Sequence, residues 1–137
     1  HLKFCKRILK VRTSACTAGV YGELGRYPLY ISRFCRLIKY WCKIKHSSNS
    51  ILSNVYRLSL NDCLNVYTNW VSGVKQLLDN YGFSEAFTND IDIVSFPRIF
   101  KQRFIDCYIQ EWNTLLDKSN ILDEYKYSRT NWHMNHI

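Results

Sequence analysis

Residues 29–45, LYISRFCRLIKYWCKIK, constrain the fold more than any other stretch of this chain. On a helix that advances about 100° per residue, their apolar and aromatic side chains fill one half of the helical wheel. The other half carries four basic side chains and no acidic one: Arg33, Arg36, Lys39 and Lys43. A merely solvated helix face usually mixes signs and gains from i,i+4 ion pairs, whereas a stripe of one sign repels itself. The pattern therefore predicts a helix with a buried half and a basic half that faces a polyanion.

Helical spacing of apolar residues recurs along most of the chain, and no alternating run of strand length stands out. We therefore expect an all-α fold, an irregular bundle of about five or six helices. The first three expected helices cover residues 1–11, 15–24 and 29–45. A fourth follows Ser50 and contains Leu52 to Leu64, a fifth runs from Trp70 to just before Gly82, and a sixth covers 98–118, with residues 87–97 as a loop. The residues expected to cap helices at their N-termini are Thr13 or Ser14, then Ser50, then Thr68 or Asn69, with Gly82 closing the fifth helix.

Residues 20–31, VYGELGRYPLYI, hold two of the five glycines and one of the two prolines. Gly25 stands where a left-handed residue ends a helix, and Pro28 suits the first turn of the next one. Small residues recur three or four positions apart before this turn: Ala15, Ala18, Gly19 and Gly22. We expect this face, and Gly22 in particular, to lie against a neighbouring helix. A phosphate-binding loop is not predicted, because no G-x-x-x-x-G-K-[ST] pattern occurs and no strand leads into the glycines.

Positive charge is concentrated in the first third of the chain. Residues 1–46 hold eleven Lys and Arg against the single acid Glu23, whereas residues 47–137 hold eight against ten acids. Such asymmetry is typical of a polyanion-binding flank, although a charge run can also be a solvated surface. We expect one helical region made of a basic flank (1–46), a helical body (47–118) and a frayed tail (119–137). A second basic patch is expected at Lys3, Lys6, Arg7 and Lys10.

The sequence shows no pattern typical of a metal site, a disulfide framework or a membrane span. The six cysteines form no C-x-x-C pair and lie among apolar neighbours, so we expect reduced, buried side chains in an intracellular compartment, cytoplasm or nucleus. His133 and His136 have no cysteine near them in sequence, so a polar tail is the preferred interpretation there. No apolar run approaches the roughly 20 residues of a membrane helix. We expect no cofactor, no metal, no membrane contact and no small-molecule ligand.

Catalytic patterns are also missing from the sequence. Neither the acidic pair Asp90 and Asp92 nor the pair Asp123 and Glu124 has a histidine or arginine alongside, and no G-x-S-x-G occurs. The chain is therefore not expected to be an enzyme. It begins at His1 and runs directly into an amphipathic segment, so we expect it to be a piece of a longer protein.

The runs LKFCKRIL, YGELGRYPL and FKQRFIDCYIQEWN give the chain a family resemblance. It resembles the segment that follows the polymerase core in polyproteins of non-LTR (LINE-type) retrotransposons, and residues 20–41 and 100–113 match in type and order. Lys10 stands where that family usually has a glycine, so the first helix is expected to lack its C-terminal cap. The Phe/Tyr-Ala-Asp-Asp motif, whose carboxylates hold the catalytic metals of the polymerase, is absent from this chain.

The resemblance implies a non-catalytic piece of an RNA-directed DNA polymerase polyprotein. Its expected partners are the backbone of RNA or DNA and the upstream polymerase domain, with little base specificity. The residues expected to bind phosphates are Arg26, Arg33, Arg36, Lys39 and Lys43, with the second basic patch beside them. Two alternatives stay open: a helical interaction module that docks on the polymerase body, and a decayed transposon copy without function.

Overall fold

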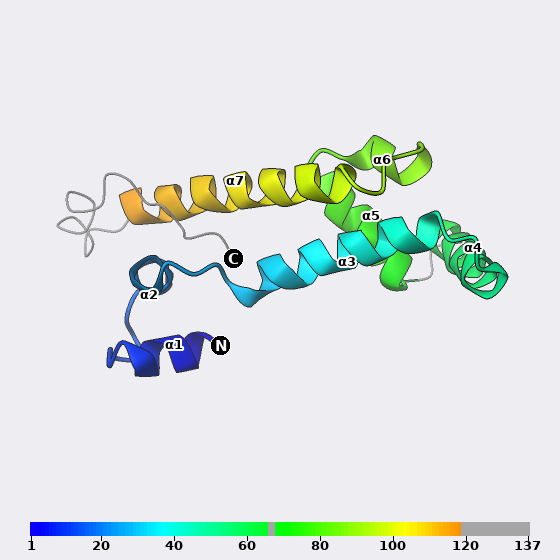
Figure 1. Ribbon diagram of the computed structural model, residues 1–137. Helices are drawn as coiled ribbons and strands as arrows, with labels where there is room; N and C mark the ends of the chain where they lie inside the picture. The colour runs from blue at the N-terminus through cyan, green and yellow to red at the C-terminus, as the bar shows by residue number, and fades with distance from the viewer. Residues whose placement is uncertain (66–67, 119–137) are drawn as a thin grey trace. The chain divides into compact units, whose positions relative to one another are not determined.

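A computed structural model describes residues 1–65 and 68–118, and within those residues the chain is all-α, with seven helices and no strand. The helices are α1 (Leu2–Ile8), α2 (Thr17–Leu24), α3 (Leu29–Lys45), α4 (Ser50–Leu64), α5 (Trp70–Asn80), α6 (Ser84–Thr88) and α7 (Phe96–Asp117) (Figure 1). The predicted fold class is confirmed. The short α6 was not predicted and overlaps the start of the expected loop at 87–97, and α7 begins two residues before the expected position. None of the described helices is long and apolar enough to cross a membrane.

Three helix ends share one backbone arrangement. Each has a residue in the left-handed conformation, with φ of 53°, 58° and 80° at Lys10, Gly25 and Gly82. In all three, the amide of the next residue donates to the carbonyl five positions back, over 2.8 to 3.2 Å. This is the hydrogen-bond pattern that closes helices in a Schellman motif. The predictions for Gly25 and Gly82 are confirmed, while the expected loss of the cap at Lys10 is wrong because lysine itself adopts the left-handed conformation.

The N-terminal caps agree with the sequence only in part. Asn69, one of the two residues expected there, caps α5, and it forms a capping box with Ser72 that was not predicted. The cap of α4 is Asn49 rather than Ser50, because the Asn49 side chain reaches the amides of both Ile51 and Leu52. The cap of α2 is Cys16, without a side-chain bond, and not Thr13 or Ser14. Those two residues lie in a turn in which the Ala15 amide donates to the Arg12 carbonyl at 3.0 Å, so they precede the helix instead of opening it.

The chain divides into two compact units, and each is considered by itself. Unit 1 comprises His1–Ser32 with Ile105–Ile137, and unit 2 comprises Arg33–Phe104. The expected frayed tail at 119–137, with His133 and His136, lies outside the described residues.

Unit 1 is built on the packing of α1 against α2. Cys5, Val20 and Tyr21 are buried together, and partly buried apolar residues of both helices pack around them. The Trp112 indole N–H of α7 donates to the Ala18 carbonyl of α2 at 2.9 Å, which ties these two helices together. Gly22 is buried in α2, as a residue at a helix contact must be, and its close approach to a neighbouring helix stays a prediction.

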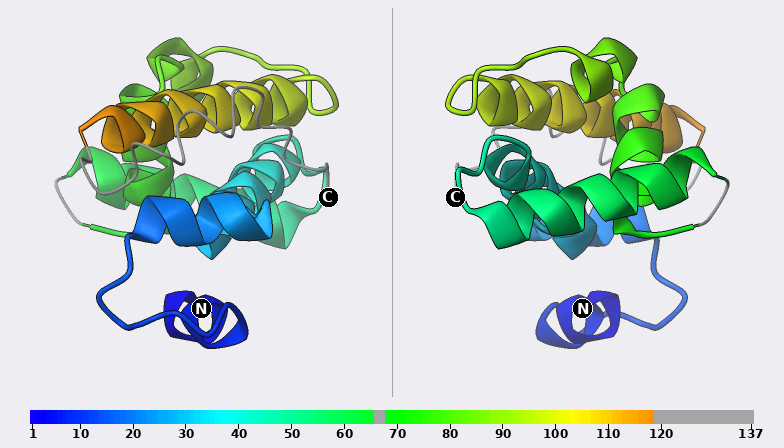
Figure 2. Two further views of the ribbon diagram at one scale, coloured as in Figure 1. Left: turned by 90° about the vertical axis from the view of Figure 1, so that its left-hand side faces the viewer. Right: turned by 90° about the vertical axis from the view of Figure 1, so that its right-hand side faces the viewer.

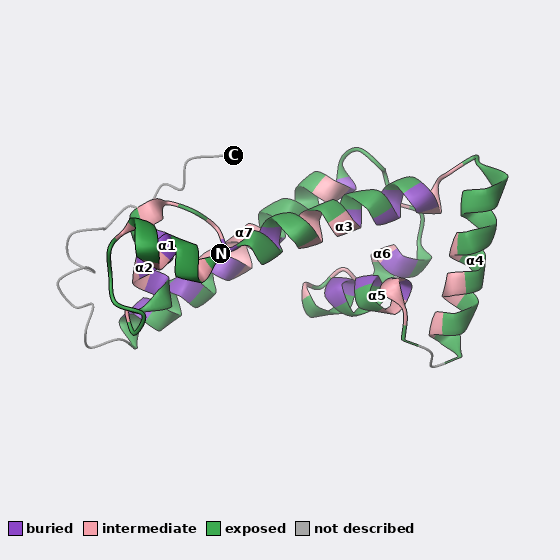
Figure 3. Cartoon of the chain, turned by 90° about the horizontal axis from the view of Figure 1, so that it is seen from below, coloured by how far each residue is buried: buried purple, intermediate pink, exposed green. Residues whose placement is uncertain are grey.

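Unit 2 has an aromatic core. Its largest fully buried side chains are Trp41, Phe100, Phe104, Ile38, Leu78, Val71 and Val74. The rings of Trp41 and Phe87 stack at 6.2 Å between centroids with 4° between their planes. Helix α5 packs against both α4 and α6 (Figure 2, right). Helix α4 contains no buried residue, as its lack of purple in Figure 3 shows.

The six cysteines all lie in described residues and are free of disulfides. Cys5 and Cys42 are buried, as expected for small apolar side chains. Cys16 is exposed, because it caps the start of α2 instead of facing the core, so the prediction of burial is wrong there. Cys35, Cys63 and Cys107 are partly buried.

Candidate functional site

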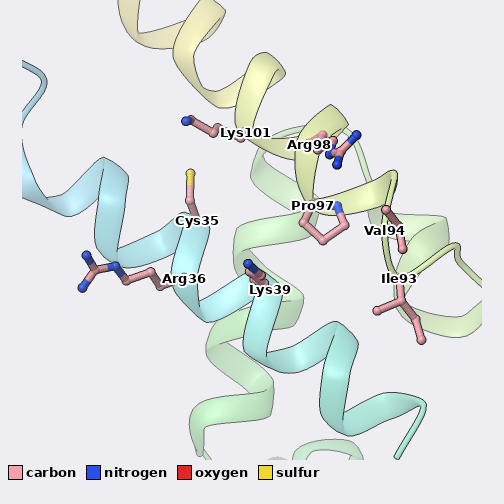
Figure 4. A pocket seen from close by; sticks show the side chains of 8 residues that line it. All are labelled: Cys35, Arg36, Lys39, Ile93, Val94, Pro97, Arg98 and Lys101. Atoms are coloured by element: carbon pink, nitrogen blue, oxygen red, sulfur yellow. The ribbon is translucent and has the colours of Figure 1, made fainter. Parts of the chain in front are cut away.

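A basic recess on unit 2 is formed by residues that lie far apart in sequence. Arg36 and Lys39 of α3 meet Arg98 and Lys101 of α7 around a cavity of about 460 Å³ (Figure 4). The recess is completed by Cys35 and by apolar side chains at and just before the start of α7: Ile93, Val94 and Pro97. We call this feature the basic recess.

The register of α3 and α7 against the core directs these cations outward. On α3, Ile38, Trp41 and Cys42 are buried, so the residues on the opposite half of the helix face solvent. On α7, Phe100 and Phe104 are buried. Arg98 and Lys101 lie three positions apart and therefore share one exposed face of α7. Because the apolar faces of α3 and α7 are buried in the core, the four cations on their opposite faces line one cavity.

The charge of the basic recess is not neutralised by ion pairs. Within residues 1–65 and 68–118, none of its four cations lies in a salt bridge. The nearest acid in sequence is Asp92, whose carboxylate accepts the Ser95 amide at 2.8 Å. Hydrogen bonds from Ser95 and Val94, and more weakly the charge of Arg98, lower the pKa of Asp92. Asp92 is thus an ionised group that holds the turn before α7, and the recess keeps an excess of positive charge.

Backbone amides at the start of α7 are already used. Pro97 has no N–H, the Phe96 amide donates to the Asp92 carbonyl at 3.0 Å, and the Arg98 amide donates to the Ser95 carbonyl at 3.0 Å. An anion in the recess would therefore be held by side chains and not by an amide cradle. Arginine and lysine in this role bind phosphate by charge and by donated hydrogen bonds.

Cys35 is the one thiol that lines the recess. Burial raises the pKa of its thiol, and the positive charge of Lys101 lowers it by less. The thiol is therefore protonated at neutral pH, and since the thiolate is the nucleophile, Cys35 is not activated for covalent chemistry.

The other predicted phosphate-binding residues lie outside the basic recess. Arg33 and Lys43 are exposed on α3, beyond the lining of the cavity. Arg26 and the second basic patch belong to unit 1, where Arg26, Lys3, Arg7 and Lys10 are exposed. Lys6 is partly buried and donates to the Thr13 carbonyl. The predicted turn residues Gly25 and Pro28 lie between α2 and α3, as expected.

Sequence reasoning missed Arg98 and Lys101. The signal for them was the run FPRIFKQRF, in which basic residues follow a helix-starting proline and no acid appears before Asp106. No local sequence pattern predicts that Arg98 and Lys101 lie near Arg36 and Lys39, because that proximity depends on the packing of α7 beside α3.

Comparisons of the chain with protein-family models, with curated proteins and with solved structures found no match.

Proposed function

We propose that this chain is a non-catalytic helical segment that flanks a reverse transcriptase and binds template or primer nucleic acid through its phosphate backbone. The observation that carries the proposal is the basic recess, where Arg36, Lys39, Arg98 and Lys101 surround one cavity without a salt bridge among the described residues. The YGELGRYPL run supports the retrotransposon context. The catalytic carboxylates would belong to the upstream polymerase domain.

The arrangement of the cations favours an extended polyanion over a single small anion. In Figure 4, Arg36 and Arg98 extend toward opposite sides of the cavity and do not converge on one point. Arg33 and Lys43 continue the basic stripe along exposed positions of α3. A nucleic-acid strand offers successive phosphates to such a row, and its sugars can lie against the apolar side chains of Ile93 and Val94.

Salt dependence of binding tests this proposal. If the four cations of the recess each neutralise a phosphate, the logarithm of the binding constant for an RNA–DNA hybrid falls with a slope of about −3.5 against the logarithm of salt concentration. Fluorescence anisotropy of a labelled hybrid, titrated with the 137-residue chain at several salt concentrations, gives that slope. A slope near zero would contradict the proposal.

Variants locate the phosphate contacts. We expect Arg98→Gln and Lys101→Gln each to weaken binding and to reduce the magnitude of the slope by about 1. Lys75→Gln is the matched control, because Lys75 is exposed on α5 of the same unit and does not line the recess. An equal effect of the control would mean that binding follows net charge and is not localised at the basic recess.

A second candidate function, a helical interaction module that docks on the upstream polymerase domain, is favoured by α4. Ile51, Val55 and Leu58 recur at helical spacing on α4 and are 71%, 51% and 60% exposed. Exposed apolar stripes of this kind often mark contact surfaces.

Two double variants separate the two candidate functions. The first reverses the charge of the basic recess, Arg36→Glu with Lys39→Glu. The second makes the exposed face of α4 polar, Val55→Ser with Leu58→Ser. The second candidate replaces the first if charge reversal leaves hybrid binding unchanged while the α4 variant abolishes association with the upstream domain.

A further inference from the structure

A second recess, in unit 1, has the opposite chemical character. Its volume is about 310 Å³, and its walls come from α2, the first turn of α3 and the part of α7 in this unit. Four aromatic side chains contribute to the lining: Tyr21, Tyr30, Tyr108 and Trp112. Ligand sites in proteins start at about this volume, roughly 300 Å³, and are usually lined by aromatic and apolar side chains. We call this feature the aromatic recess.

The aromatic walls are held in place by the fold of unit 1. Tyr21, Tyr108 and Trp112 are buried, and the Trp112 indole is fixed by its hydrogen bond to the Ala18 carbonyl at 2.9 Å. The rings of Tyr30 and Tyr108 are 6.4 Å apart between centroids and nearly perpendicular, at 74°. This edge-to-face pair makes a corner whose ring faces carry partial negative charge.

The rim of the aromatic recess adds one full negative charge. Glu111 is exposed and is the single carboxylic acid among the lining residues. It forms no salt bridge within the part of the chain that the structure describes. Burial raises the pKa of Tyr108, and the charge of Glu111 is among the further causes that raise it. Tyr108 is therefore a neutral phenol, and the negative charge of the recess resides on Glu111.

Ring faces and a nearby carboxylate attract cations and repel phosphates. The exposed lining is mostly apolar, and apart from the rim carboxylate its side-chain acceptors are the neutral hydroxyls of Thr17 and of the three tyrosines. A strongly hydrated ammonium would lose water there without full replacement. A trimethylammonium group has no N–H to satisfy and disperses its charge over methyl groups that pack on aromatic faces.

We propose that the aromatic recess binds a trimethylammonium group, with Tyr30 and Tyr108 forming the corner that receives the methyl groups and Glu111 at the rim supplying the counter-charge. The same chemistry exists in free choline-type molecules and in trimethylated lysine side chains of proteins. This inference concerns unit 1 and is independent of nucleic-acid binding at the basic recess in unit 2.

Choline and its uncharged isostere neohexyl alcohol, in which a tert-butyl group replaces the trimethylammonium group, test the proposal. Each is titrated into the 137-residue chain, and the indole N–H signals are followed in two-dimensional proton–nitrogen NMR spectra. Choline is expected to displace the signal of Trp112 and to bind about tenfold more tightly than the isostere, because cation–π attraction and the carboxylate act on the charged ligand alone. The Trp41 indole in unit 2, which donates to the Tyr56 hydroxyl, is the internal control and is expected to stay in place.

Variants identify the groups that recognise the cation. Glu111→Gln is expected to weaken choline binding about threefold to tenfold, and Tyr30→Leu is expected to weaken it similarly. Glu85→Gln makes the same charge change at an exposed position of α6 and is expected to have no effect. For Glu111→Gln and Tyr30→Leu, a Trp112 signal of the ligand-free variant at the wild-type position shows that unit 1 keeps its fold, because that indole is bonded to the Ala18 carbonyl.

Three results would overturn the proposal: no displacement of Trp112 by choline, equal binding of the isostere, or unchanged choline binding by Glu111→Gln. A short peptide with trimethyllysine forms the second arm of the experiment. Tighter binding of the peptide than of choline would assign the ligand to a methylated protein, and the reverse order would assign it to a free small molecule. Either order supports the recess as a trimethylammonium site.

Discussion

At the scale of single residues, Lys10 holds a conformation that its side chain disfavours. Its φ of 53° lies in the left-handed region, where glycine pays no steric penalty and other L-residues do. The Val11 amide nevertheless donates to the Lys6 carbonyl at 3.1 Å and closes α1. A helix end can thus keep its hydrogen bonds without glycine when the bonds and the packing of α1 on α2 compensate for the strain at one residue.

The first prediction follows from this strain. We expect Lys10→Gly to raise the free energy of unfolding by about 1 kcal/mol, since glycine removes the steric cost of the left-handed conformation. Urea denaturation followed by circular dichroism measures the change.

Lys10→Gln is the control that removes the charge and keeps a long side chain, and we expect it to leave the free energy of unfolding unchanged. The reciprocal change Gly25→Ala is expected to lower the free energy of unfolding, because a φ of 58° strains any residue with a side chain. No steric clash contributes, since an added Cβ at Gly25 meets no atom within 4 Å. A stabilisation by Lys10→Gln equal to that by Lys10→Gly would assign the effect to charge.

Gly22 is the subject of the second prediction. It is buried in α2, two residues before the helix ends, and we predict that it lies against a neighbouring helix. We expect Gly22→Val to lower the melting temperature clearly below that of Gly22→Ala, because overpacking costs about 1–3 kcal/mol while loss of glycine flexibility returns up to about 1 kcal/mol. If valine melts no lower than alanine, Gly22 does not lie at a close contact between helices.

At the scale of helices, amphipathic spacing does not by itself show what a helix packs against. Helices α3 and α4 both repeat apolar residues at helical intervals, yet α3 buries Ile38, Trp41 and Cys42 completely whereas α4 buries none. Helix α4 is attached to the unit by polar and aromatic contacts. The Asn69 side-chain amide donates to the Ser59 carbonyl at 2.7 Å, and the Trp41 indole donates to the Tyr56 hydroxyl at 3.2 Å.

The third prediction concerns Asn69, which has two roles at the junction of α4 and α5. Its side-chain oxygen accepts the Val71 and Ser72 amides, and its side-chain nitrogen binds α4. We expect Asn69→Ala to lower the free energy of unfolding by about 2 kcal/mol, from the lost cap together with the lost bond between helices. Asn49→Ala is the matched control, because Asn49 is an exposed cap without the second bond, and we expect a loss of about 1 kcal/mol. Equal losses in urea denaturation would show that the bond to Ser59 contributes nothing.

At the scale of the whole molecule, the formal charge of +8 does not describe the binding surfaces. The basic recess gathers four cations on unit 2, while the aromatic recess on unit 1 has a carboxylate as its single charge. The two recesses therefore differ in the sign of their charge, and we propose ligands of opposite sign for them. The four cations of the basic recess are exposed side chains, and contacts from such side chains to phosphates carry no sequence information.

The fourth prediction is that nucleic-acid binding is nearly independent of base sequence. Hybrids of equal length and different composition are expected to bind within about threefold of one another, whereas raising salt from 50 to 200 mM is expected to weaken all of them by about two orders of magnitude. Competition experiments in fluorescence anisotropy provide both comparisons. A strong preference for one sequence would show that base contacts, and not phosphates alone, hold the nucleic acid.

The sequence by itself determined the fold class, both ends of α3 and the glycine ends at Gly25 and Gly82, because each depends on residues within a few positions. Helical period, capping amides and left-handed turns are local interactions. It also determined which side of α3 is basic, and Arg33, Arg36, Lys39 and Lys43 are all exposed.

Only the tertiary structure decided which of those cations act together. Arg36 and Lys39 join Arg98 and Lys101 about sixty positions away, because the buried faces of α3 and α7 contribute to one aromatic core and leave their opposite faces around one cavity. The aromatic recess has the same origin, since Tyr30 and Tyr108 meet only when α3 and α7 are folded together in unit 1. Local sequence predicts neither the proximity of the four cations nor that of the two tyrosines. The free energy that holds each set together comes from burial of other side chains on the same helices.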